Sequence, residues 1–235
     1  MSPEDSAKEI KPVLKVHLQR DLERLRKDIL SLGAMVEEAT NKAITALVHR
    51  LPDMAREVID GDHEIDSKEL EVEDECLKIL ALHQPVAGDL RFIVTVMKVN
   101  NDLERVGDLA VNIAERVGYI STHDPIDVPE DFTEMAKVVG TMVKKSLDAL
   151  VGGDVELARS VCRDDDVVDS INEKMWSILQ ARMIEDPSII KRASHTLSAS
   201  YQLERIADHA TNIAEDVVFM VDGKIIRHGR GEDPA

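Results

Sequence analysis

The chain has 235 residues and a formal net charge of −17, because 29 Lys and Arg residues face 46 Asp and Glu residues. Only six residues are aromatic: one Trp, two Tyr and three Phe. This scarcity argues against a β-sandwich or barrel, and the acidic excess disfavours nucleic acid as a partner because phosphate groups repel such a surface. A hydrophobic content of 43% is enough to bury a core, which excludes a wholly disordered chain.

The cysteines and the apolar runs indicate the compartment. Cys76 and Cys162 provide no disulfide framework and are typical of a reducing environment, where we expect both to be buried and inert. The first residues show no signal peptide, and no run approaches the ~18 apolar residues of a membrane span. We therefore expect a cytoplasmic protein, with Met175 and Trp176 in its core.

Prolines, glycines and capping residues divide the chain into six predicted helices. In chain order they cover about 17–51, 53–82, 88–119, 131–150, 154–184 and a last segment that ends near 221. This pattern predicts an all-α fold of two tandem homologous three-helix bundles, residues 1–120 and 131–222. A proline-containing linker, 121–130, joins them, and a flexible tail, 223–235, follows.

An internal repeat supports this division. Residues 103–117 match residues 203–217 at ten of fifteen positions, at an offset of 100. A second set of matches, at an offset of 103, relates the first two helices of each half and includes Asp66-Ser67 and Asp169-Ser170. Matches kept in order across whole helices indicate a duplicated three-helix unit.

Each repeated helix carries an apolar stripe and an acidic stripe. On a helix of 100° per residue, Leu103, Val106, Ala110, Ile113, Ala114 and Val117 share one face. Glu104 and Asp108, spaced i and i+4, lie on nearly the opposite side. Arg105 is one residue along and is expected to point elsewhere. Near-surface acid pairs are therefore expected.

The preceding helix of each half carries the same spacing, so four carboxylates can converge in each half if the two helices are antiparallel neighbours. The candidate metal ligands are Asp62, Asp66, Glu104 and Asp108 in the first half, and Asp165, Asp169, Glu204 and Asp208 in the second. Clustered carboxylates need a counter-ion, and oxygen ligands suit Mg²⁺, Mn²⁺, Ca²⁺ or iron. A solvated acidic face is the alternative. His63 and His209 adjoin these acids and are expected at the surface or beside the ligands.

These motifs resemble those of the PhoU family of phosphate-transport regulators. The residues that carry the resemblance are Leu-Glu-Arg-Val-Gly-Asp (103–108), Asn-Ile-Ala-Glu (112–115) and Gln-Pro-Val-Ala-Gly-Asp-Leu-Arg (84–91). The resemblance covers essentially the whole chain. The second half departs from it, because it has Asp186-Pro187-Ser188 and no counterpart of the Pro-Val-Ala-Gly-Asp-Leu-Arg residues, 85–91, of the first half.

The resemblance implies multinuclear iron or zinc clusters on the paired acids. It also implies a homodimer that represses the phosphate-starvation response and restrains phosphate import. Its partners would be the ATPase subunit of a phosphate ABC transporter and a membrane sensor histidine kinase. We therefore expect a regulator without enzymatic activity. The competing hypothesis is a Mg²⁺-dependent all-α nucleotide pyrophosphohydrolase, although no nucleophile–base arrangement or phosphate-binding loop is visible in the sequence.

Overall fold

The computed structural model describes residues 3–126, 128–129 and 131–226, leaving out the side chains of residues 3–15. Its elements are α1 (Pro3–His49), α2 (Pro52–His83), α3 (Ala87–Ile120), α4 (Asp131–Gly152), α5 (Val155–Glu185), the short 3₁₀ helix η1 (Pro187–Ile189) and α6 (Ile190–Asp222). The described residues contain no strand. The predicted all-α class and its six long helices are confirmed.

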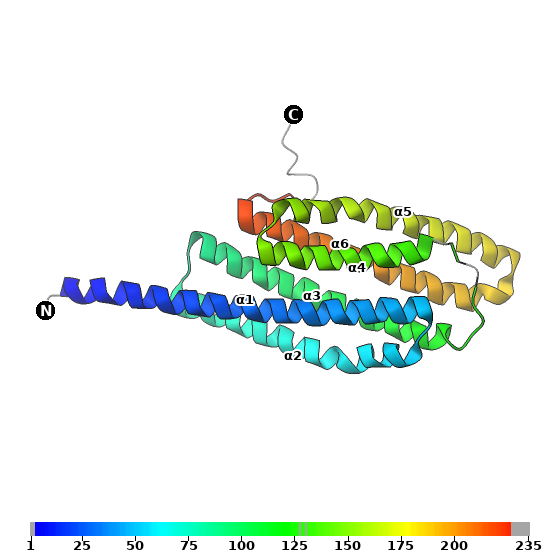
Figure 1. Ribbon diagram of the computed structural model, residues 1–235, viewed down its shortest axis with the longest axis horizontal. Coiled ribbons are helices and arrows are strands. Elements are labelled where there is room, and N and C mark those ends of the chain that lie inside the picture. The colour runs from blue at the N-terminus through cyan, green and yellow to red at the C-terminus, as the bar shows by residue number, and fades with distance from the viewer. Residues whose placement is uncertain (1–2, 127, 130, 227–235) are drawn as a thin grey trace, which may run out of the picture.

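The start of α5 follows the local chemistry of its capping residue. Asp154 caps α5 as predicted, because its Oδ1 accepts a hydrogen bond of 3.0 Å from the backbone N–H of Leu157. The predicted start of α1 near residue 17 is wrong, since the helix begins at Pro3. The added segment, 3–16, contains three Lys and two Glu, which have high intrinsic helix propensity. It projects beyond the other helices in Figure 1.

The two three-helix units lie side by side along their lengths, with α3 packed against α6 (Figure 1). These two helices run antiparallel, because Lys98 contacts Asp216 whereas Asp102 contacts His209. Helices α1 and α4 also touch. Gly33 permits this approach, since a Cβ added there would lie 2.8 Å from Leu147 Cδ2. The halves therefore form one continuous bundle.

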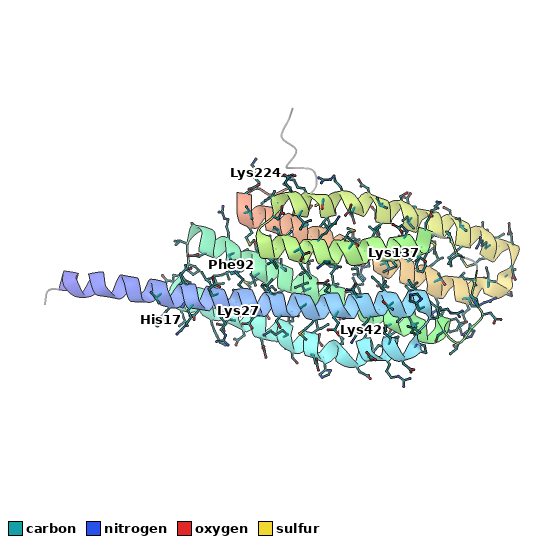
Figure 2. The ribbon with its side chains drawn as sticks, viewed as in Figure 1. His17, Lys27, Lys42, Phe92, Lys137 and Lys224 are labelled. Atoms are coloured by element: carbon teal, nitrogen blue, oxygen red, sulfur yellow. The ribbon has the colours of Figure 1, made fainter. Side chains whose placement is uncertain are left out.

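The core consists of the predicted apolar stripes. The members of the α3 stripe, Leu103, Val106, Ala110, Ile113, Ala114 and Val117, are all buried. Met175 is buried as expected, but Trp176 is 49% exposed, so its predicted core position is wrong. At the rim, the Arg26 guanidinium lies 4.7 Å from the ring centroid of Phe92, which Figure 2 labels near the start of α3.

The predicted linker, 121–130, is described except for residues 127 and 130, and the predicted tail, 223–235, is described only as far as 226. Residues 227–235 lie outside the described residues. No helix within the described part of the chain is both long enough and apolar enough to cross a membrane.

Candidate metal centres

The acid pairs of the first half lie on neighbouring faces of α2 and α3. Gly107 of α3 brings the two helices close, because a Cβ at Gly107 would lie 3.3 Å from the Ile65 side chain and 3.9 Å from Asp62 Oδ1. Any larger residue at this position would fill the space beside the Asp62 carboxylate. A close approach of the two helices thus falls where the predicted acids meet.

Electrostatics shows that the predicted acids of the first half converge. Partial burial, and then the like charges of Asp66 and Asp108, raise the pKa of the Asp62 carboxyl. Burial and the nearby charge of Asp108 likewise raise the pKa of Glu104, with a smaller contribution from Asp66. Asp66 and Asp108 therefore lie close enough to Asp62 and Glu104 to oppose the ionisation of those two carboxyls.

The first half supplies one cation of its own. Arg105 Nε lies 3.4 Å from Glu104 Oε2, and Arg105 Nη1 lies 3.2 Å from Asp108 Oδ2. The expectation that Arg105 points elsewhere is wrong, because its long side chain bends back over the i−1 and i+3 positions. This guanidinium partly neutralises the α3 acid pair.

A fifth carboxylate, which the motif did not predict, joins the first half. Burial raises the pKa of Glu69 first, and the charges of Glu73 and Asp66 raise it further. The buried Asn100 side chain donates hydrogen bonds to Glu69 Oε1, at 2.9 Å, and to the Glu69 carbonyl, at 3.1 Å. Glu69 follows Asp66 by three residues, so an extension of the acidic stripe along α2 could have found it.

The second half shows the stronger crowding of charge. Burial, and then the charges of Asp169 and Asp208, raise the pKa of Asp165 to about 6. Burial followed by the Asp208 and Asp169 charges raises the pKa of Glu204, and burial followed by Asp169 raises that of Asp208. All four predicted acids of α5 and α6 are thus electrostatically coupled.

Two carboxylate oxygens of the second half are buried without a hydrogen-bond partner: Asp165 Oδ1 and Glu204 Oε2. Arg205, the counterpart of Arg105, makes no ion pair within the described residues, and its guanidinium lies 5.9 Å from the Tyr201 ring centroid. Its charge nevertheless acts to lower the pKa of Glu204 and Asp208, against the larger effects that raise them. An unpartnered buried carboxylate oxygen carries a desolvation penalty that a bound cation removes. The residues present therefore fit a cation ligand.

The two halves differ at the position of Glu69. Its counterpart, at the offset of 103, is Asn172, which accepts a hydrogen bond of 2.8 Å from the Ser200 hydroxyl. Ser200 in turn occupies the place of Asn100. The supporting hydrogen bond from the third helix is preserved while the carboxylate at this position is lost. The second half has another extra carboxylate, Asp166 in the place of His63, whose charge helps to raise the pKa of Asp165.

The two histidines adjoining the motifs make other contacts. His63 Nδ1 lies 2.8 Å from the carbonyl oxygen of Asp60 on its own helix. His209 Nδ1 lies 2.8 Å from Asp102 Oδ1, across the contact between the halves. Within the described residues, no group of three or more His, Cys, Asp or Glu side chains is arranged to hold a metal ion. The eight ligands therefore stay a prediction.

The fold and these paired acids define a class of protein: a duplicated three-helix unit in which each half carries one acidic face. This face lies on α2 and α3 in the first half and on α5 and α6 in the second. The PhoU domain model matches residues 29–117 and again residues 132–217. These two segments correspond to the two halves of the repeat. The chain belongs to the PhoU family.

Curated relatives and solved structures agree with this assignment. The chain is 38% identical to the phosphate-specific transport system accessory protein PhoU homolog of Aquifex aeolicus. The match covers 90% of this chain and 96% of the relative. It is 37% identical to the homolog of the same name from Pseudomonas putida, covering 88% of this chain and 82% of the relative. The crystal structure of PhoU from Pseudomonas aeruginosa superposes with a TM-score of 0.83 at 36% identity, covering 88% of this chain and 99% of that one.

Proposed function

We propose that this protein is a metal-binding regulator of phosphate uptake and of the phosphate-starvation response. It represses starvation signalling and import by contacting the ATPase subunit of a phosphate ABC transporter and a membrane sensor histidine kinase. The observation that carries the proposal is the pair of equivalent carboxylate clusters in a chain of the PhoU family. The names of the curated relatives place those proteins in phosphate transport.

The metal part of the proposal rests on crowded negative charge that is only partly compensated. In the second half, the four predicted carboxylates have no cationic partner at ion-pair distance within the described residues, although the charge of Arg205 acts on Glu204 and Asp208. Burial disfavours the charged forms of Asp165, Glu204 and Asp208. A divalent ion placed among them converts mutual repulsion into attraction and satisfies the orphaned oxygens Asp165 Oδ1 and Glu204 Oε2. Bound metal would thus stabilise the fold and fix the α5–α6 acidic surface.

The donor chemistry guides the choice of ion. All eight proposed ligands are carboxylates, which bind hard and borderline cations and can bridge two of them. We propose iron or zinc, in a site that can hold more than one ion, with Mn²⁺, Mg²⁺ and Ca²⁺ as competitors. The eight residues are Asp62, Asp66, Glu104, Asp108, Asp165, Asp169, Glu204 and Asp208.

Elemental analysis tests the metal proposal. Protein purified without a metal-affinity step should contain iron or zinc, and the content should fall in variants Asp66→Ala, Glu104→Ala and Asp108→Ala. Asp60→Ala is the matched control, because Asp60 is exposed on α2 and lies about 200° around the helix from Asp62. Wild-type protein that contains no metal, and gains no thermal stability from added metal, would contradict the proposal.

A complementation assay tests the regulatory part. A strain that lacks its PhoU-family protein should express a phosphate-starvation reporter at high phosphate, and this chain should restore repression. The purified chain should bind the transporter ATPase subunit and the cytoplasmic part of the kinase, and should elute as a homodimer. Failure to restore repression, together with nucleotide hydrolysis in Mg²⁺, would favour the pyrophosphohydrolase instead.

A further inference from the structure

A cavity of about 220 Å³ lies where the C-terminal ends of α1 and α3 meet the linker and the start of α6. Figure 1 shows these segments together at the right-hand end of the bundle. The volume far exceeds the ~15 Å³ that a single water needs on the same measure. Its walls combine apolar side chains, among them Leu47, Ile120 and Ile126, with the guanidinium groups of Arg50 and Arg192.

The cations at this cavity have no acidic partner at ion-pair distance within the described residues. Arg50 Nη2 donates to the carbonyl oxygens of Ile120 and His123, while Arg50 Nε is buried without a hydrogen-bond partner. Arg192 Nη1 donates to the carbonyl oxygen of Asp124 at 3.3 Å. Backbone carbonyls therefore orient both guanidinium groups. Asp124 also lines the cavity, and the charge of Arg192 helps to lower the pKa of Asp186, but neither acid forms an ion pair with Arg50 or Arg192 within the described residues.

Further positive charge surrounds Tyr119, whose ring lines the cavity. The rings of His123 and His195 stack on Tyr119, each with a centroid distance of 3.9 Å. Lys191 Nζ lies 4.8 Å from the same ring centroid. Burial lowers the pKa of His195, and the charges of Arg116, Lys191 and His123 lower it further. The cluster is therefore a region of positive potential in a protein of net charge −17.

The internal repeat shows that this charge is specific to one end of the contact between α3 and α6. At the opposite end, Lys98 Nζ lies 3.0 Å from Asp216 and 5.2 Å from the ring centroid of Phe219. At the offset of 100, Asp216 corresponds to Arg116 and Phe219 corresponds to Tyr119. The repeat thus keeps the aromatic ring at both ends, and a lysine lies beside each ring, although Lys98 corresponds to Ser198 and not to Lys191. A cation, Arg116, stands where the other end has its acid. The Nε of Arg116 is buried without a hydrogen-bond partner.

We propose that this cavity binds a phosphate-type oxyanion between Arg50 and Arg192, in the positive field of Arg116 and Lys191. Guanidinium groups suit this ligand because they donate paired hydrogen bonds to tetrahedral oxyanions. The apolar walls lower the local polarity around a bound anion and so strengthen the charge interaction. The site goes beyond the regulatory role proposed above and does not depend on metal.

Isothermal titration of the full chain with inorganic phosphate, in EDTA, tests the site without interference from bound metal. We expect saturable binding that Arg50→Gln and Arg192→Gln each weaken at least tenfold. Arg24→Gln is the control, since it removes the same charge from a side chain that is 70% exposed in the middle of α1 and does not line the cavity. Arg192→Gln keeps the test valid if Arg50→Gln does not fold, because Arg192 makes only the single hydrogen bond to Asp124 among the described residues.

Parallel titrations with AMP and ATP distinguish the two sources of the oxyanion. Binding of orthophosphate alone assigns the site to free phosphate, and tighter binding of a nucleotide assigns it to a phosphoryl group whose base lies on the apolar walls. Binding of none of the three, or equal weakening by Arg24→Gln, would overturn the proposal. A chain that binds phosphate in EDTA yet fails to restore repression would contradict only the regulatory proposal.

Discussion

Replacement of Asp165 by Asn should stabilise the metal-free protein. Asp165 is partly buried beside Asp169 and Asp208, and its pKa rises from 3.8 to about 6. At 1.36 kcal/mol per pKa unit, this rise corresponds to an upper value of about 3 kcal/mol against the charged native form. Screening by solvent and salt reduces it, so we expect Asp165→Asn to raise the free energy of unfolding by about 1 to 3 kcal/mol at pH 7.

The pH dependence of this gain has a definite sign. Because the native pKa is raised, the folded protein binds the proton more tightly than the unfolded chain does between pH 3.8 and about 6. The contribution of Asp165 to stability is therefore fully favourable below pH 3.8 and is lost as the pH rises to 6. The difference between Asp165→Asn and wild type should be near zero at pH 4 and reach its full value above pH 6.

Urea unfolding in EDTA at several pH values measures this difference, with Asp60→Asn as the control for simple loss of one negative charge. Saturating metal should reverse the order, since the wild type gains a ligand that the variant lacks. Equal stability of wild type and Asp165→Asn at pH 7, or a difference that does not change with pH, would refute the argument from crowded charge.

Three further predictions concern single side chains. Arg105→Gln should lower the free energy of unfolding in EDTA by about 0.5 to 1 kcal/mol and tighten metal binding in the first half, because the internal counter-charge of Glu104 and Asp108 is gone. Calorimetry with and without metal measures both effects. Weaker metal binding by the variant would contradict the role given to Arg105. Asp154→Ala removes the N-cap of α5 and should cost about 1 kcal/mol by urea unfolding, whereas no loss would show that the cap is dispensable. Ile113→Ala should lower the free energy of unfolding by about 2 to 5 kcal/mol, because the Ile113 side chain is 1% exposed. Leu82→Ala is the control and should change it by less than about 0.5 kcal/mol, because Leu82 is 70% exposed. Comparable losses in the two variants would contradict the assigned core.

Local periodicity was sufficient to predict most of the fold. The apolar stripe of α3 and the repeat at offset 100 are properties of neighbouring positions, and helix geometry converts them directly into a buried face. The packing of α3 on α6 is a long-range property, and the sequence predicted two bundles without predicting how they lie together. Trp176 was misplaced because its neighbour Met175 is buried, and one helical step rotates a side chain by about 100°.

The candidate sites were predictable where both halves carry the same residues. Comparison of the halves selected Asp62 with Asp165 and missed Glu69, because its counterpart is Asn172. The orientation of Arg105 depends on side-chain torsions that spacing along a helix does not determine. The cationic cavity joins Arg50, Arg192 and Tyr119, which are far apart in the chain and share no motif, so it becomes visible only in the folded structure.

Native mass spectrometry of the chain tests the central claim, that each half binds metal through its own acid pairs. We predict that the wild type retains metal ions, that Glu104→Gln with Asp108→Asn loses those of the first half, and that Glu204→Gln with Asp208→Asn loses those of the second. Each double variant should keep the ions of its unchanged half. A wild type without metal, or two double variants that both keep the full number of ions, would contradict the account.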